Sequence, residues 1–204
     1  MIRIYPLIFI LLWSSAFITT KPIVDNSDPF AALAFRFFFV ALGFYLFSIY
    51  TNNSLIIKKK NLIESILSGV LFHGFYLGGV FFSISIGMPA GIAALIVTLQ
   101  PILTNILSGP ILNEKISIKQ WIGAFLGFMG AGLVLGLDLG SQIPTTGLIA
   151  TVVALIAITI STIWQKKLSN DLPLPVSNMY QATGGFLFHL MIITFFVDPY
   201  INFT

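Results

Sequence analysis

The chain has 204 residues, of which 57% are hydrophobic and only 8% are charged. Soluble domains carry about 25% charged residues, so this composition excludes an ordinary soluble protein. The absence of cysteine excludes disulfides, thiolate nucleophiles and cysteine-bound metals. The net charge of +3 lies in short Lys clusters between apolar runs, which favours positive loops beside membrane spans over a nucleic-acid surface.

Several apolar runs are long enough to cross a bilayer, whose core of about 30 Å needs about 20 residues of helix. The sequence predicts seven such spans, at residues 4–20, 30–50, 62–87, 90–112, 118–137, 146–164 and 176–197. The connections are short and contain turn residues, as in "YTNNS" and "SNDLPLP". We therefore expect an all-α polytopic membrane helix bundle of about seven transmembrane helices.

Basic residues gather at alternate ends of these spans. One set of ends carries Arg3, Lys58, Lys59, Lys60, Lys115, Lys119, Lys166 and Lys167. The opposite ends carry Lys21 together with Asp25, Asp28, Asp138 and Asp198. Because cytoplasmic loops carry the excess of Lys and Arg, this pattern predicts a cytoplasmic N-terminus.

Ionisable side chains also fall inside the predicted spans. Arg36 lies about two turns inside the second span, where a charge costs from a few to more than ten kcal/mol. It either snorkels to the nearby interface, forms a structural pair or contacts a ligand. His73 and His189 lie near the middle of the third and seventh spans. Because histidine titrates near neutral pH, His73 is a candidate proton carrier, although a neutral donor to a carbonyl is an equal alternative.

The fourth span is unusually polar. Thr98, Pro101 and Asn105 share one helix face, and a second polar line lies about 100° away. Such a helix must face protein or water rather than lipid, and Pro101 predicts a kink. Two interpretations stay open: the helix lines a cavity, or it forms hydrogen bonds inside a packed bundle.

The fifth span contains two GxxxG patterns, at Gly123 with Gly127 and at Gly132 with Gly136, which favour close packing of helices. The motifs of membrane proteases, GxSG and HExxH, are absent from the sequence. We therefore expect no catalytic residue, no cofactor and no metal site. Passage of a solute through the bundle is the favoured function.

A weak internal repeat supports that interpretation. The first span runs into "TTKPIVDNSDPFAALAFRF" and the sixth into "WQKKLSNDLPLPVSNMYQA", so each apolar helix is followed by Lys, a polar loop, Pro and a new helix. The copies are five spans apart and must therefore have opposite orientations. Inverted repeats of this kind are typical of secondary transporters.

The segments "WSSAFITTKPIVDNSDPFAALAFRF" and "GMPAGIAALIVTLQPILTNILSGPILNEKISIKQWIGAFLGFMGAGLVL" resemble the EamA domain of the drug/metabolite transporter superfamily. The resemblance implies ten helices in two inverted five-helix repeats and export of small metabolites, amino acids or drugs by alternating access. It implies a first repeat over residues 4–138 and an incomplete second repeat of two helices over 146–204. It also implies that the first four helices of a repeat surround the cavity, while the fifth packs away from it.

Carried over by position, the resemblance implies a substrate cavity formed by Trp13, Arg36, Tyr76, Thr98, Pro101 and Asn105, with Glu114 holding the turn after the fourth span. The expected partners are a small-molecule substrate and the lipid bilayer, with no nucleic acid, and the expected location is the bacterial inner membrane. The chain ends after the seventh span, so we expect a fragment of a ten-helix protein or a truncated relative that forms homo-oligomers. The alternative function is a non-transporting membrane scaffold or partner subunit.

Overall fold

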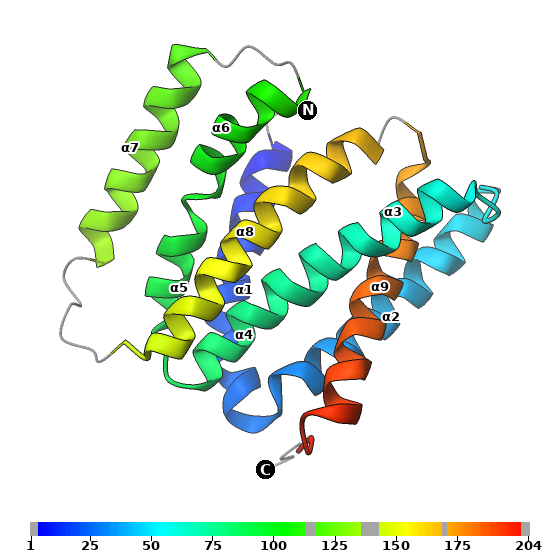
Figure 1. The fold of residues 1–204 in the computed structure, drawn as a ribbon, viewed down its shortest axis with the longest axis horizontal. Coiled ribbons are helices and arrows are strands. Elements are labelled where there is room, and N and C mark those ends of the chain that lie inside the picture. Colours follow the sequence, from blue (N-terminus) through cyan, green and yellow to red (C-terminus); the bar gives the residue numbers. More distant parts are fainter. Residues whose placement is uncertain (1–3, 113–116, 136–142, 169–170, 201–204) are drawn as a thin grey trace.

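The computed structural model describes residues 4–112, 117–135, 143–168 and 171–200. In these ranges the chain forms seven helical rods (Figure 1). In chain order the elements are α1 (Ile4–Asn26), α2 (Pro29–Tyr50), a third rod made of α3 (Lys59–Gly69), η1 (Val70–Leu77) and α4 (Gly78–Ser85), a fourth made of α5 (Ala90–Val97) and α6 (Gln100–Leu112), then α7 (Ile118–Leu135), α8 (Thr145–Leu168) and α9 (Leu174–Phe195).

The predicted all-α membrane bundle is confirmed. Each of the seven rods falls on one predicted span. Within the described residues, four helices are long and apolar enough to cross a membrane, namely Pro29–Tyr50, Lys59–Ser85, Ala90–Leu107 and Thr145–Leu168. The division into repeats at residues 4–138 and 146–204 stays a prediction.

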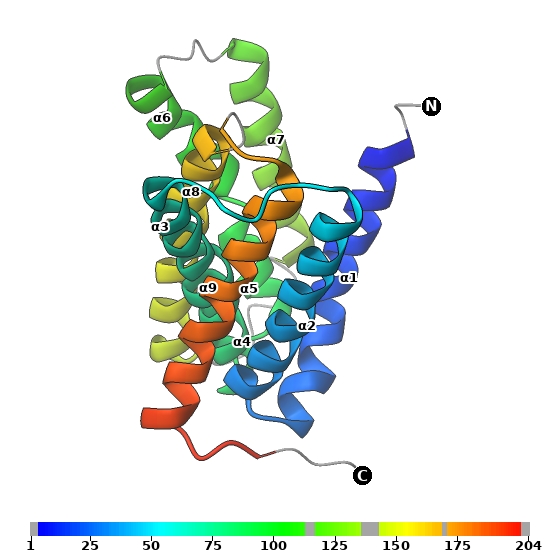
Figure 2. The ribbon, with the colours of Figure 1, turned by 90° about the vertical axis from the view of Figure 1, so that its right-hand side faces the viewer.

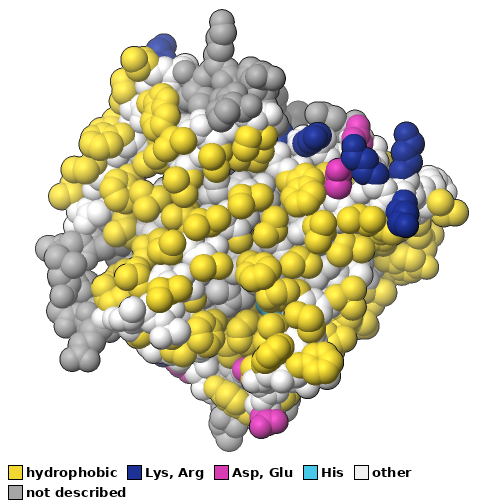
Figure 3. Space-filling view, in the orientation of Figure 1, with side chains coloured by type: hydrophobic (Ala, Val, Ile, Leu, Met, Phe, Trp, Pro, Cys, Tyr) yellow, Lys and Arg dark blue, Asp and Glu magenta, His cyan; other side chains and the backbone are white. Residues whose placement is uncertain are grey.

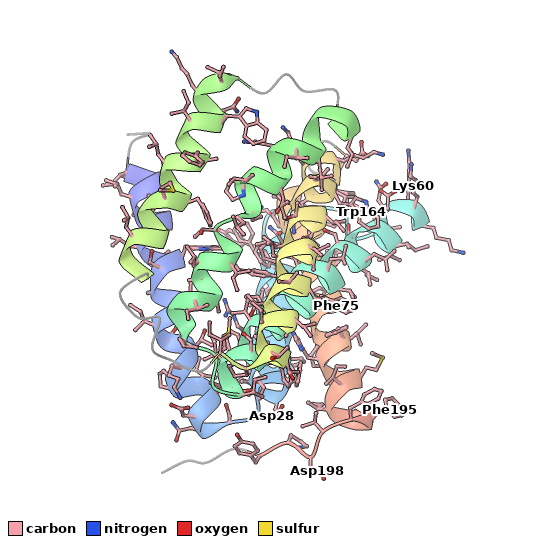
Figure 4. All side chains as sticks on the ribbon, turned by 60° about the vertical axis from the view of Figure 1, so that its left-hand side comes forward. Asp28, Lys60, Phe75, Trp164, Phe195 and Asp198 are labelled. Atoms are coloured by element: carbon pink, nitrogen blue, oxygen red, sulfur yellow. The ribbon has the colours of Figure 1, made fainter. Side chains whose placement is uncertain are left out.

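Successive rods run in opposite directions, and α2 packs along α9 while α8 packs against η1 and α4 (Figures 1 and 2). Helix α7 lies at the edge of the bundle, where it packs against α5 and α6. Asp28 and Asp198 lie at one end of the bundle, and Lys60 and Trp164 lie toward the other (Figure 4). The charge asymmetry predicted from the sequence therefore exists in space.

The outer surface is that of an integral membrane protein. Hydrophobic side chains cover the middle of the face in Figure 3, and the Lys, Arg, Asp and Glu side chains visible there gather toward its ends. Large apolar side chains such as Phe35, Leu46 and Phe125 are exposed. Because water would not stabilise such a surface, lipid is its natural solvent.

Close helix packing is made by glycines that the sequence did not single out. A Cβ built on Gly69 of α3 would collide with the carbonyl oxygen of Gln181 in α9, and one on Gly184 would collide with that of Ile66. By contrast, a Cβ on Gly123 or Gly127 would meet no described atom within 4 Å. The close packing predicted at the glycines of α7 is therefore wrong for the described structure, and Gly136 lies outside the described residues.

Candidate functional site

Two cavities lie against α1 and share the side chains of Trp13, Phe17 and Phe72. The larger cavity has a volume of about 820 Å³, is open on one side, and is lined by residues of α1, η1, α5, α6, α7 and α8. The smaller cavity has a volume of about 290 Å³ and lies among α1, α2, η1 and α4. Both volumes are of the order of small-molecule sites, which span about 300–1,000 Å³.

The helix of the fourth span breaks beside the larger cavity. Helix α5 ends at Val97 and α6 begins at Gln100. Pro101 has no backbone N–H to donate to the carbonyl of Val97. In the break, the hydroxyl of Thr98 donates to the carbonyl of Leu95 at 2.6 Å. The predicted kink is thus a two-residue turn at Thr98 and Leu99, through which helical backbone hydrogen bonds such as Leu99 N–H to the carbonyl of Ile96 continue.

Polar groups of α6 and α8 meet at the edge of the larger cavity. The Nε2 of Gln100 donates to the hydroxyl of Thr162 at 3.1 Å, and Gln165 also lines the cavity. The two interpretations of the polar fourth span therefore both apply. Thr98 and Pro101 line the cavity, whereas Gln100 also joins two helices.

The glycines of α7 form part of the wall of the larger cavity. Gly123 and Gly127 line it together with Ala124 and Phe128. Small residues here leave room that larger side chains would occupy. The expectation that the fifth helix packs away from the cavity fails at the larger cavity, which α7 lines, and fits the smaller cavity, whose described lining contains no residue of α7.

Aromatic rings dominate the smaller cavity. The rings of Trp13 and Tyr76 are parallel to within 10°, with centroids 6.4 Å apart, and the ring of Phe72 lies edge-on to Tyr76. Phe17 and Phe37 complete this wall. Thr20 and His73 are among the polar residues that line the same space.

Arg36 also lines the smaller cavity. Its guanidinium carbon lies 5.7 Å from the centroid of the Phe37 ring, a cation–π geometry. In the described part of the chain the ion pair is between Lys21 and Asp25, and no carboxylate pairs with Arg36. The Arg36 side chain is exposed, which fits snorkelling toward the interface as well as a ligand contact, and a charged group inside a span is a functional candidate.

Segment η1 is a π-helix that carries Phe72, His73 and Tyr76 into the smaller cavity. Single-turn π segments are rare and occur often at functional sites. The Nε2 of His189 donates to the backbone carbonyl of His73 at 2.9 Å, which joins α9 to η1. Of the two histidines, His189 therefore donates a hydrogen bond to a backbone carbonyl. The proton-carrier role of His73 stays a prediction.

The structure brings most of the predicted site residues together. Trp13 lines both cavities, Arg36, His73 and Tyr76 line the smaller one, and Thr98 and Pro101 line the larger one. Asn105 is partly buried on α6 and is not among the described residues that line either cavity, so its role stays a prediction. Glu114 lies outside the described residues.

The sequence reasoning missed Phe17 and Phe72, which line both cavities. A signal was available, because Phe17 follows Trp13 by four residues and so shares its helix face. The sequence gives no comparable signal for Thr162 and Gln165, whose helix α8 meets α6 only in the folded bundle.

Apolar helices around an aromatic cavity, with an exposed apolar surface, define a polytopic membrane helix bundle. The model of the EamA-like transporter family matches residues 3–136, and the chain belongs to this family.

Among curated proteins, the chain is similar to the "Uncharacterized transporter YvbV" of Bacillus subtilis, with 23% identity over 94% of this chain and 62% of the relative. It is also similar to a "Probable amino-acid metabolite efflux pump" of Salmonella typhimurium, with 25% identity over 83% of this chain and 54% of that protein. A protein of the same description in Escherichia coli is 24% identical over 79% of this chain and 52% of the relative. The chain thus matches about half the length of these relatives.

Proposed function

We propose that this chain forms part or all of a membrane transporter that exports small metabolites, amino acids or drugs by alternating access. The observation that carries the proposal is the break between α5 and α6 at the edge of the larger cavity. Interrupted helices at mid-membrane are typical of the binding sites of secondary transporters. Membership of the EamA-like transporter family supports the same function.

The residues around the cavities have distinct roles in this proposal. Trp13 and Tyr76 supply flat apolar surface, and Thr98 supplies a hydroxyl beside the break. Arg36 supplies positive charge, and Asn105 is a further candidate polar contact. The break at Pro101 lets α5 and α6 change their relative angle when access alternates.

The proposed setting is the bacterial inner membrane, with the N-terminus and the Lys-rich end of the bundle in the cytoplasm. The charge asymmetry between the two ends supports this orientation. The proposal gives the chain no chemical reaction and requires no nucleic-acid partner. It is compatible with homo-oligomers.

The access of water to the larger cavity tests the proposal. Because the natural chain has no cysteine, Thr98→Cys introduces a single thiol on the cavity wall. We expect it to react with a small polar methanethiosulfonate in membranes. The matched control, Ile106→Cys, places a thiol on the exposed apolar side of α6, where lipid protects it.

Reaction of Thr98→Cys alone supports a water-filled pathway. If neither thiol reacts, the cavity is dry and the chain is a packed scaffold or partner subunit, which overturns the proposal. Equal reaction of both thiols would show that the bundle has no lipid-protected face and would overturn it as well.

A further inference from the structure

We infer that the smaller cavity binds a small organic monoanion, a carboxylate on a flat apolar body, and disfavours the zwitterionic amino acid of the same shape. This inference rests on the proposed function and names the substrate class of that site. Three features carry it: an uncompensated guanidinium, an aromatic wall, and the absence of a described carboxylate in the lining.

Arg36 is an exposed cation in the lining of the smaller cavity, where it can bind an anion. It is seven residues after Pro29, at which α2 begins, so about 10 Å of helix separates it from that end. Its guanidinium contacts the ring of Phe37 and, among the described residues, has no acidic partner. Because a planar guanidinium donates two parallel hydrogen bonds to a carboxylate, a bound carboxylate would supply both the charge and the geometry.

The acidic side chains nearest in the sequence are already engaged. Asp25 pairs with Lys21. Asp28 accepts hydrogen bonds from the backbone N–H groups of Phe30 and Ala31, each at 2.9 Å, and so caps α2. Neither is among the residues that line the smaller cavity. Among the described residues, no acidic side chain therefore competes with a ligand for the charge on Arg36.

The rest of the wall suits a flat apolar body. The parallel rings of Trp13 and Tyr76, together with those of Phe17, Phe37 and Phe72, enclose the space beside Arg36. Aromatic groups gain from offset or edge contacts with such rings. A volume of about 290 Å³ limits the ligand to a small molecule.

An amino acid fits this cavity less well than the matching acid. Its ammonium is attached to the carbon beside the carboxylate, so binding the carboxylate to Arg36 brings the ammonium close to the guanidinium. The described lining of the smaller cavity contains no Asp or Glu to neutralise it. The rings of Trp13 and Tyr76 offer the ammonium a cation–π contact, but no negative charge that would neutralise it.

Three probes of nearly equal size separate these effects: hydrocinnamate, its neutral amide hydrocinnamamide, and phenylalanine. Their dissociation constants are measured by equilibrium dialysis with the full chain in nanodiscs. We expect hydrocinnamate to bind about tenfold or more tightly than either of the others, as hydrogen bonds to charged groups imply. Equal affinity for hydrocinnamate and its amide would overturn the role of Arg36.

Three variants locate the effect. Arg36→Gln should abolish the preference for hydrocinnamate over the amide, whereas Lys21→Gln, which removes a positive charge outside the cavity, should keep it. Arg36→Lys keeps the charge but loses the planar fork, and it should keep a reduced preference. If Arg36→Gln is not recovered folded, the wild-type comparison of the three probes decides alone.

The outcomes also separate this inference from the proposed function. Tighter binding of phenylalanine than of hydrocinnamate would overturn the inference and leave a transporter of amino acids. Binding of none of the three probes, together with an unreactive Thr98→Cys, would overturn both. Binding of none with a reactive Thr98→Cys would overturn the inference alone.

Discussion

Glycine has opposite consequences at two places in this molecule. At Gly69 the backbones of α3 and α9 approach so closely that an added methyl group would collide with the carbonyl of Gln181. We expect Gly69→Ala to destabilise the bundle by about 1–3 kcal/mol, the usual cost of overpacking. Thermal unfolding in detergent, followed by loss of monodispersity, measures the effect.

The control for this change is Gly123→Ala, whose methyl group would meet no described atom within 4 Å. Because alanine favours a helix over glycine by up to about 1 kcal/mol, this variant should be as stable as the natural chain or slightly more stable. An equal loss of stability in both variants would mean that α7 packs closely against something other than the described residues.

Residue patterns alone could not have separated these glycines. Gly123 and Gly127 have the GxxxG spacing, whereas Gly69 and Gly184 come from different helices and have no shared pattern. The GxxxG spacing indicates that one helix face carries small residues. It does not indicate whether another helix lies against that face. For the same reason Arg36 and Tyr76 could be nominated from the sequence, but their meeting at one cavity needed the fold.

At the scale of the element, hydropathy predicted every rod to within a few residues, except that α1 extends six residues past its predicted end, to Asn26. The interior of two rods was less predictable. Pro101 predicted the break between α5 and α6, because proline lacks a backbone N–H donor wherever it occurs. The π segment Val70–Leu77 contains no proline that would predict it, and it packs against α8 and α9, which are distant in the sequence.

The break between α5 and α6 gives a prediction for transport. Pro101→Leu restores the missing N–H and favours a continuous helix, so we expect it to slow transport more than it lowers abundance in the membrane. Uptake of labelled hydrocinnamate and phenylalanine into proteoliposomes, divided by the amount of inserted protein, measures this.

The matched control is Pro22→Leu, which also changes a proline inside a helix but lies outside both cavities. It should leave transport per inserted protein unchanged. Should Pro101→Leu lower transport and abundance in equal proportion, the proline would be a structural residue only.

Two serines join the third rod to α8. The hydroxyl of Ser161 donates to the backbone carbonyl of Ser68 at 3.0 Å, and the two hydroxyls lie 3.1 Å apart in a fully buried contact. We expect Ser161→Ala to cost about 0.6–1.7 kcal/mol, the range of such bonds between membrane helices. Chemical unfolding in mixed micelles provides the measurement.

Ser85 provides the comparison, because its exposed hydroxyl bonds only to the carbonyl of Phe82 on its own helix. Ser85→Ala should leave stability nearly unchanged. A similar loss of stability in both variants would show that the hydrogen bond between α3 and α8 stabilises the bundle no more than a bond within one helix.

At the scale of the whole molecule, the two ends of the bundle differ in charge because the chain alternates direction at every loop. Lys60 lies at one end and Asp28 and Asp198 lie at the other (Figure 4). This separation of charge can be predicted from the sequence, because it depends only on the order of the spans and on no contact between helices. The cavities could not be predicted in the same way, since their walls come from as many as six elements.

The charge separation fixes the expected orientation in the membrane. Ser54→Cys places a thiol in the loop between α2 and α3 at the Lys-rich end, and Asn26→Cys places one beside Asp25 at the other end. A membrane-impermeant maleimide added to intact cells should label Asn26→Cys and spare Ser54→Cys until the membrane is opened. The reverse pattern would place the Lys-rich end outside. Export would then have to begin from the opposite end of the cavities, because the same bundle would be inserted upside down.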